Sequence, residues 1–184
     1  MLSVYITDLA AYNKGLLLGR WVTLPTHDLS KEIDAILRDG SEVCCDELGY
    51  YEHHEEYFIT DYEWSDIGLC EIGEHEDIYT LNDVLNIISK TSCTDIRSQK
   101  IMKFLLDNHY ANDLADAICK LDSVLIYEDM TLVDVASSFV EDIYDLNKLP
   151  SIIANNIDYE SIAKDLSYEG RYYEVDNDVF EYVG

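Results

Sequence analysis

The sequence predicts an α+β fold, arranged as an elongated chain of three small α/β-type domains with a long acidic surface. Two apolar patterns support this class: short runs rich in β-branched and aromatic residues, typical of strands, and longer segments with apolar residues at helical spacing. The third observation is charge, since the 184 residues hold 12 Lys and Arg against 38 Asp and Glu, a formal net charge of −26. Acidic stretches recur along the chain, which favours an elongated molecule with a long negative face.

The first predicted domain covers residues 1–63 and contains three expected strands. Leu2–Thr7 and Trp21–Leu24 have the composition of strands, and Glu56–Trp64 adds an aromatic-rich third. Between the second and third strands, apolar residues recur at helical spacing over residues 29–37. This order predicts a small sheet with one helix.

The flanking residues predict where that helix begins and ends. Asp28 is a suitable N-cap, and Gly40 is expected to end the helix, because glycine favours the conformation found just beyond helix C-termini. Residues 41–54, which are rich in acidic side chains, are then expected to form an acidic loop.

The middle domain, residues 64–108, is predicted to be mainly helical. One apolar stripe spans residues 81–88, and Thr80 with Asp83 resembles a capping box at its start. A second helix is expected over Asp95–Leu106.

The third domain, residues 109–184, is predicted to be α+β. Residues 132–143 have the most regular helical periodicity in the chain, with acidic residues opposite the apolar stripe. The other expected elements are helices over residues 114–121 and 159–166, a strand at Ser123–Tyr127, and a terminal hairpin formed by Tyr172–Val175 and Val179–Tyr182.

The sequence lacks the common motifs of catalysis and metal binding. It contains no phosphate-binding loop, nucleophile elbow, zinc pattern or EF-hand loop. Its five cysteines are irregularly spaced, its first residues do not resemble a signal peptide, and no apolar stretch approaches the ~20 residues of a membrane span. We therefore expect a reduced, soluble, cytoplasmic protein that is not an enzyme and uses no cofactor or metal.

Two small clusters offer weaker functional interpretations. His53 and His54 lie among glutamates and are the candidate residues of a cation site or an enzymatic loop. Because adjacent histidines point in different directions, a solvated loop is the preferred interpretation. Arg97, Lys100 and Lys103 are too few to bind nucleic acid beside such an excess of acid, so we expect them to form salt bridges instead.

The distribution of acidic residues carries the functional prediction. Residues 39–89 contain fifteen Asp and Glu and no Lys or Arg, whereas ordinary surfaces mix the two signs. The 15 Tyr, 4 Phe and 2 Trp indicate a folded protein and not a disordered acidic tail. The 26 net charges correspond to roughly 44 Å of duplex DNA, at about one charge per ~1.7 Å. We therefore expect a basic partner that normally holds nucleic acid, and no direct nucleic-acid binding by this chain.

Twenty carboxylates are predicted to contact that partner in place of phosphates. An alternative function is that of a general acidic chaperone or interaction protein for basic nucleic-acid-binding partners, which would bind many basic proteins about equally well. The predicted partner-binding carboxylates are Asp46, Glu47, Glu52, Glu55, Glu56, Asp61, Glu63, Asp66, Glu71, Glu74, Glu76, Asp77, Asp83, Asp107, Asp113, Asp116, Asp134, Glu141, Asp142 and Asp145.

Four segments, in the same order along the chain, resemble the ArdA antirestriction family, which is carried by conjugative plasmids and transposons. The opening VYITDLAAYNKGLLLGRWVTLP resembles the family's first strand, Tyr-Asn-x-Gly loop and second strand. EYFITDYE at Glu56–Glu63 resembles the family's strand ending Asp-Tyr-Glu, and LNDVL at Leu81–Leu85 is similar to its middle-domain helix. DYESIAKDLSYEG at Asp158–Gly170 resembles its late signature, although Lys164 stands where the family usually has Arg.

The resemblance implies an elongated three-domain protein that forms a homodimer and mimics bent B-form DNA. Members of the family inhibit type I restriction-modification enzymes by occupying their DNA-binding groove, without a cofactor and without catalysis. The family's antirestriction motif and dimer contact would then fall near Phe139–Ile153. The candidate dimer-contact residues are Phe139, Val140, Leu146, Leu149 and Ile152.

Overall fold

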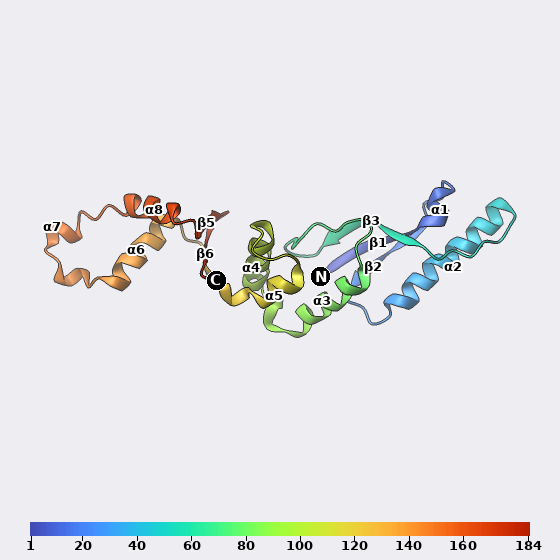
Figure 1. The fold of residues 1–184 in the computed structure, drawn as a ribbon, viewed down its shortest axis with the longest axis horizontal. Helices are drawn as coiled ribbons and strands as arrows, with labels where there is room; N and C mark the ends of the chain where they lie inside the picture. Colours follow the sequence, from blue (N-terminus) through green and yellow to red (C-terminus); the bar gives the residue numbers. More distant parts are fainter.

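Two three-stranded antiparallel sheets and the helices around them form an elongated α+β molecule (Figure 1). The computed structural model describes the backbone of residues 1–184 and the side chains of all of them except Ser92. The N-terminal sheet and its covering helix lie at one end of the molecule, and the last three helices form the other end. The α+β class that the sequence predicts is therefore confirmed.

The N-terminal sheet contains the three strands expected from the sequence. Strands β1 (Leu2–Asp8), β2 (Gly19–Leu24) and β3 (Tyr57–Trp64) pair in the order β2-β1-β3, and both pairings are antiparallel. The central strand β1 buries its apolar residues completely, and helix α2 (Leu29–Leu48) packs against β1 and β2. This arrangement leaves β3 at an edge of the sheet, where its outer residues face solvent.

Helix α2 continues through Gly40, so the expected helix end at that residue is wrong. The absence of a side chain at Gly40 allows the helix to approach β1 closely, because a Cβ there would overlap the carboxylate of Asp8. The helix ends at Leu48, and Gly49 caps it with a φ of 79°, a left-handed conformation that suits glycine. The acidic loop expected over residues 41–54 is therefore confined to residues 49–56.

The middle of the chain is helical, as the sequence predicts. Helix α3 (Ile78–Lys90) is followed by α4 (Ile96–Asp107) and the shorter α5 (Leu114–Cys119). The N-cap of α3 is Asp77, whose carboxylate accepts hydrogen bonds from the first-turn amides, and Thr80 lies inside that turn. The expected capping box starting at Thr80 is therefore corrected to an aspartate cap three residues earlier.

The C-terminal sheet contains the expected strand and the expected hairpin. Strands β4 (Val124–Tyr127), β5 (Tyr172–Val175) and β6 (Asp178–Tyr182) pair in the order β4-β6-β5, again antiparallel throughout. The central strand β6 is buried on both faces, because Val179 belongs to one apolar core and Phe180 to the other. The ring of Phe180 stacks on Phe104 of α4 with centroids 4.7 Å apart.

The last helices build the far end of the molecule. Helix α6 (Leu132–Ile143) packs on α8 (Tyr159–Tyr168), and α7 (Ser151–Ala154) lies between them in the chain. Helices α6 and α8 match the expected ones closely, since their apolar stripes face a common core. The short elements that the sequence pattern did not indicate are α1 (Leu9–Asn13), α7, and the 3-10 helices Ser92–Thr94, Leu121–Ser123 and Leu146–Lys148.

Two apolar cores hold these elements together. The larger core runs from the N-terminal sheet through α3, α4 and α5 to one face of the C-terminal sheet. The smaller core lies between the other face of that sheet and helices α6 and α8. The larger core thus contains residues from all three segments predicted as domains, and the independence of those domains stays a prediction.

Within the described residues, none of the helices combines the length and the apolar composition that crossing a membrane requires. All five cysteines carry free thiols.

Candidate partner-binding surface

The predicted partner-binding carboxylates lie on the molecular surface. Nineteen of the twenty belong to exposed residues, and Asp116 is half-buried. Asp116 accepts hydrogen bonds from Asn112 and pairs with Lys120 at 2.9 Å, so its charge is largely directed inward. The other nineteen remain accessible to a partner.

Few of these carboxylates are neutralised by the chain itself. Apart from Asp116, four have a cationic partner: Glu52 pairs with Lys14, Asp107 with Lys103, Asp145 with Lys148, and Asp66 with the N-terminal amine. Glu55 lies 3.8 Å from the ring of His53. The remaining fourteen have no cationic partner among the side chains that the structure describes. Each exposed ion pair contributes only about 0–1 kcal/mol to stability. Because the unpaired carboxylates outnumber the paired ones, this surface carries a large excess of negative charge.

A β-bulge directs two of the carboxylates outward from β3. In the pairing with β1, Ile59 lies opposite Ile6 and Asp61 lies opposite Tyr5, so Thr60 is the additional residue. The bulge shifts the alternation of the strand, which places Asp61 and Glu63 on its exposed side. Two residues in a strand span about 6.6 Å, so these carboxylates form a regularly spaced pair on a rigid edge.

The segment between β3 and α3, residues 65–77, presents five of the predicted carboxylates from an anchored backbone. Leu69 and Ile72 are buried in the larger core. The indole nitrogen of Trp64 donates to the Cys70 carbonyl at 3.1 Å, and the Ile59 amide donates to the Glu74 carbonyl at 2.9 Å. The exposed acids of the segment are thus held in place without regular secondary structure; they are Asp66, Glu71, Glu74, Glu76 and Asp77.

The acidic loop 49–56 is anchored by a buried histidine. The side chain of His54 is completely buried, and its Nδ1 lies 2.6 Å from the Asp8 carboxylate, which is also completely buried. The backbone amide of His54 donates to the Ser41 hydroxyl of α2 at 3.1 Å. His53, in contrast, is exposed. The two histidines do point in different directions, but the interpretation of both as parts of a solvated loop is wrong for His54.

Lys14 connects this anchor to the acidic surface. Its Nζ lies 3.3 Å from His54 Nε2 and also donates a hydrogen bond to Glu52. That hydrogen bond raises the pKa of Lys14 and lowers the pKa of Glu52, so both groups are charged at neutral pH. A lysine facing Nε2 requires that this nitrogen accept, which leaves Nδ1–H to donate to Asp8. The network therefore places the ring of His54 between a buried carboxylate and an ammonium group.

The structure gives different outcomes for the histidine pair and for the basic cluster. No group of three or more metal-binding side chains is assembled within the described part of the chain, including around His53 and His54. The basic cluster forms salt bridges, as expected: Arg97 with Glu128 at 3.4 Å, Lys100 with Asp178 at 2.6 Å, and Lys103 with Asp107 at 3.1 Å.

The carboxylates of the C-terminal part lie mainly on α6 and at its ends. Asp134 completes a capping box with Thr131, and hydrogen bonds from the side chain and backbone of Thr131 lower its pKa. Glu141 and Asp142 are exposed near the other end of the helix. The acidic residues opposite the apolar stripe are therefore solvent-exposed, as the periodicity predicts.

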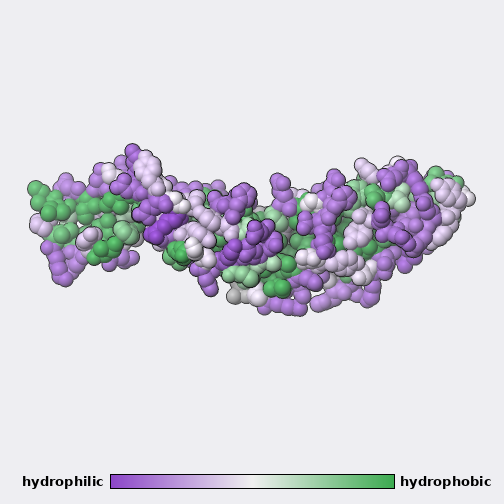
Figure 2. All heavy atoms as spheres, viewed as in Figure 1, coloured by the Kyte–Doolittle hydropathy of each residue, from purple (hydrophilic) through white to green (hydrophobic). Residues whose placement is uncertain are grey.

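The candidate dimer-contact residues differ in accessibility. Phe139 and Ile152 are exposed by 41% and 76%, whereas Leu146 and Leu149 are half-buried. Val140 is only 8% exposed and is already buried by its own chain, so it is not an accessible contact residue in this structure. Figure 2 shows apolar surface gathered at the end of the molecule where α6 and α7 lie. Four of the five candidates thus remain available, and their role in a dimer stays a prediction.

Salt is expected to raise the melting temperature of this protein. Going from about 0.1 M to about 1 M ionic strength shortens the screening length from ~10 Å to ~3 Å, which weakens repulsion among the unpaired carboxylates more than it weakens the few exposed pairs. Calorimetry in NaCl is the suitable measurement, since sulfate also strengthens apolar burial. A melting temperature that decreases with NaCl would show that attractive pairs dominate.

Sequence reasoning missed the residues that hold the acidic surface in shape. Asp8, Lys14 and His54 come from three separate segments, and their contacts join positions 38 to 46 residues apart. No local pattern signals such a contact. The surface carboxylates were predictable because ionised side chains almost always remain exposed unless they are paired.

A comparison with protein families supports the resemblance seen in the sequence. The family model described as "Antirestriction protein (ArdA)" matches residues 4–181, and no curated protein sequence matches the chain. The match covers nearly all of both sheets, the anchored acidic segments and the apolar end formed by α6 and α7. The chain therefore belongs to the ArdA antirestriction protein family.

Proposed function

We propose that this chain is a DNA mimic that inhibits a type I restriction-modification enzyme by occupying its DNA-binding groove. The observation that carries the proposal is the set of fourteen exposed carboxylates without a cationic partner among the described side chains, on a folded, elongated molecule. Membership of an antirestriction family supplies the biological role. Inhibition of this kind works by occupancy, so it requires neither a cofactor nor a catalytic residue in the inhibitor.

The arrangement of the carboxylates supports mimicry of a rigid ligand. Asp61 and Glu63 project from a strand, and the acids of residues 65–77 project from a segment with buried anchors. The loop 49–56 is anchored by the buried side chain of His54. A rigid array loses little conformational entropy on binding. A disordered acidic tail of equal charge would have to be ordered at the moment of binding.

We propose in addition that the active form is a homodimer joined at the end of the molecule where α6 and α7 lie. Phe139 and Ile152, with the half-buried Leu146 and Leu149, give this end an apolar surface. A twofold dimer uses the same surface patch on both copies. It would extend the acidic surface beyond the length of one chain and so match a longer stretch of duplex.

The test is competition with DNA for the methyltransferase core of a type I enzyme. We expect the protein to displace a labelled duplex from the core in a competitive manner, and we expect its own affinity to fall steeply as NaCl increases. Fluorescence anisotropy of the labelled duplex measures both effects. Binding that persists at high salt without displacing the duplex would contradict the proposal.

A second basic protein distinguishes specific mimicry from general acidic binding. The methyltransferase core is compared with a histone-like protein of similar net charge under identical salt. Preference for the core by a large factor supports mimicry of DNA in a particular groove. Equal affinity for both would favour a general acidic chaperone instead.

A further inference from the structure

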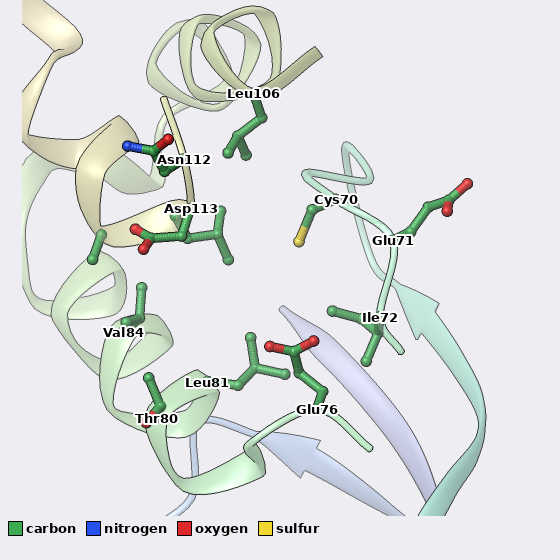
Figure 3. Close-up of a pocket in the computed structure, with 12 residues that line it drawn as sticks. Cys70, Glu71, Ile72, Glu76, Thr80, Leu81, Val84, Leu106, Asn112 and Asp113 are labelled. Atoms are coloured by element: carbon green, nitrogen blue, oxygen red, sulfur yellow. The ribbon is translucent and has the colours of Figure 1, made fainter. Parts of the chain in front are cut away.

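The middle of the molecule contains a cavity, a feature that mimicry of DNA charge alone does not require. It has a volume of about 350 Å³ and lies between segment 65–77, helix α3 and the junction of α4 with α5 (Figure 3). This volume is at the lower end of the range of about 300–1,000 Å³ typical of ligand pockets. It is large enough for one long side chain.

The floor of the cavity is apolar and preformed. Leu81 of α3 and Leu114 of α5 are each 7% exposed, and Leu106 of α4 points toward Leu81 across the cavity (Figure 3). One wall is fixed by the hydrogen bond from Trp64 to the Cys70 carbonyl. The opposite wall is fixed by the N-cap of α5, where Asp113 accepts from the Asp116 amide at 2.8 Å. The walls therefore exist before any partner binds.

Three acidic residues, Glu71, Glu76 and Asp113, are among those that line the cavity. The carboxylates of Glu71 and Asp113 point away from the space (Figure 3), and among the side chains that the structure describes no lysine or arginine lines it. The carboxylate of Glu76 and the thiol of Cys70 face the interior (Figure 3). Glu76 has no hydrogen-bonding or cationic side-chain partner within the described residues. Its charge is therefore available to a cation that enters the cavity.

The thiol of Cys70 adds to this environment without competing for the cation. Burial, and then the nearby charge of Glu76, raise the pKa of Cys70 to about 11, so the thiol is neutral at neutral pH. A neutral thiol behaves as a small, polarisable apolar group. The cavity thus has an apolar interior with a single ionised group, that of Glu76, directed into it.

We propose that this cavity receives one arginine side chain from the basic groove of the protein partner. The aliphatic stem would lie on the leucine floor, and the guanidinium group would face Glu76. Arginine suits such a site because its head is weakly hydrated and can donate several hydrogen bonds, while its stem readily covers apolar surface. The proposal rests on the proposed function, because it takes the partner to be a basic DNA-binding groove.

The consequence for inhibition is a contact that duplex DNA does not offer. Phosphates attract an arginine by charge, but they offer no apolar cavity of leucine side chains for its stem. Arginines seated in desolvated pockets are among the residues that dominate protein–protein binding energies. A pocketed arginine would therefore let the inhibitor compete with DNA by packing as well as by charge.

The first test uses a probe that does not depend on the restriction enzyme. N-acetyl-argininamide is titrated into the methyl-labelled protein at constant ionic strength, with the neutral N-acetyl-citrullinamide as the matched control. We expect the methyl NMR signals of Leu81, Leu106 and Leu114 to shift with the arginine compound only. We also expect Glu76→Gln to weaken this binding by about fivefold. Signals that stay unchanged, or that shift equally with both compounds, would overturn the proposal.

The second test separates this inference from the proposed function. Glu76→Gln and the cavity-filling Val84→Phe are compared with Glu42→Gln and Val133→Phe, which change exposed residues outside both the cavity lining and the predicted partner-binding set. We expect the two cavity variants to weaken binding to the methyltransferase core by about tenfold and the two controls by less than about twofold. Equal effects in both pairs would refute the arginine site and leave DNA mimicry intact. Absence of binding by the unmodified protein would refute DNA mimicry, while the titration would still decide on the arginine site.

Discussion

Replacing Asp8 with alanine is expected to lower the free energy of unfolding by about 3 kcal/mol. The Asp8 carboxylate is completely buried and accepts hydrogen bonds from the Ala11 amide at 2.9 Å and from His54 Nδ1 at 2.6 Å. Alanine would leave both donors buried without an acceptor, and each such group costs about 1–3 kcal/mol. For a chain of this size the loss corresponds to a decrease of roughly 6–12 °C in melting temperature.

The isosteric Asp8→Asn variant tests whether the charge of Asp8, and not its shape, is responsible for this stabilisation. Its amide oxygen still accepts from Ala11, but its NH₂ group faces His54 Nδ1, which then has to accept. The remaining ring proton would move to Nε2 and face the ammonium of Lys14, 3.3 Å away. We therefore expect this variant to be destabilised as well, and Lys14→Met to relieve part of the effect in a double-mutant cycle.

Chemical denaturation of these variants measures the effect, with Asp34→Ala as the control. Asp34 is an exposed residue of α2, and its replacement is expected to change stability by no more than about 0.5 kcal/mol. A decrease as small as that in Asp8→Ala would contradict the assignment of the buried network as a structural anchor. A large decrease confined to Asp8→Ala, with Asp8→Asn unaffected, would show that the lost hydrogen bonds matter and the tautomer does not.

The same network explains which parts of the fold the sequence could predict. Helices α3, α4, α6 and α8 follow from apolar periodicity, because each buries one face against a core that accepts any apolar stripe of suitable length. Gly40 lies inside helix α2 and does not end it. Its missing side chain lets the helix backbone approach Asp8 closely, 32 positions earlier in the chain. A glycine with this role has the same local signature as a helix stop.

The candidate surface shows a similar division between local and long-range information. Exposure of nineteen of the twenty carboxylates follows from their chemistry, since an ionised side chain is rarely buried without a partner. Their presentation depends on contacts that no local pattern contains, such as the bulge at Thr60 and the burial of His54. The cavity beside α3 also requires three separate segments to converge. Sequence therefore predicts which groups carry the charge, and the fold determines how rigidly they are held.

Neutralising six carboxylates in the predicted set is expected to weaken binding to the methyltransferase core by about a hundredfold. With ~0.5 kcal/mol per exposed ion pair, six pairs contribute about 3 kcal/mol, and 1.4 kcal/mol corresponds to a factor of ten. All six side chains are exposed, and we expect the fold to be retained. The changes are Glu47→Gln, Glu55→Gln, Glu56→Gln, Glu63→Gln, Glu71→Gln and Glu74→Gln.

A charge-matched variant decides whether position matters or only total charge. It neutralises six exposed acids outside the predicted set, so both variants change the formal net charge from −26 to −20. If the carboxylates act as positioned substitutes for phosphates, the control binds nearly as well as the unmodified protein, and the first variant has a shallower dependence of binding on salt. An equal loss of affinity in both variants would mean that net charge alone attracts the partner. The protein would then act as a general polyanion and not as a DNA mimic. The control changes are Asp34→Asn, Glu42→Gln, Asp122→Asn, Glu160→Gln, Asp165→Asn and Asp176→Asn.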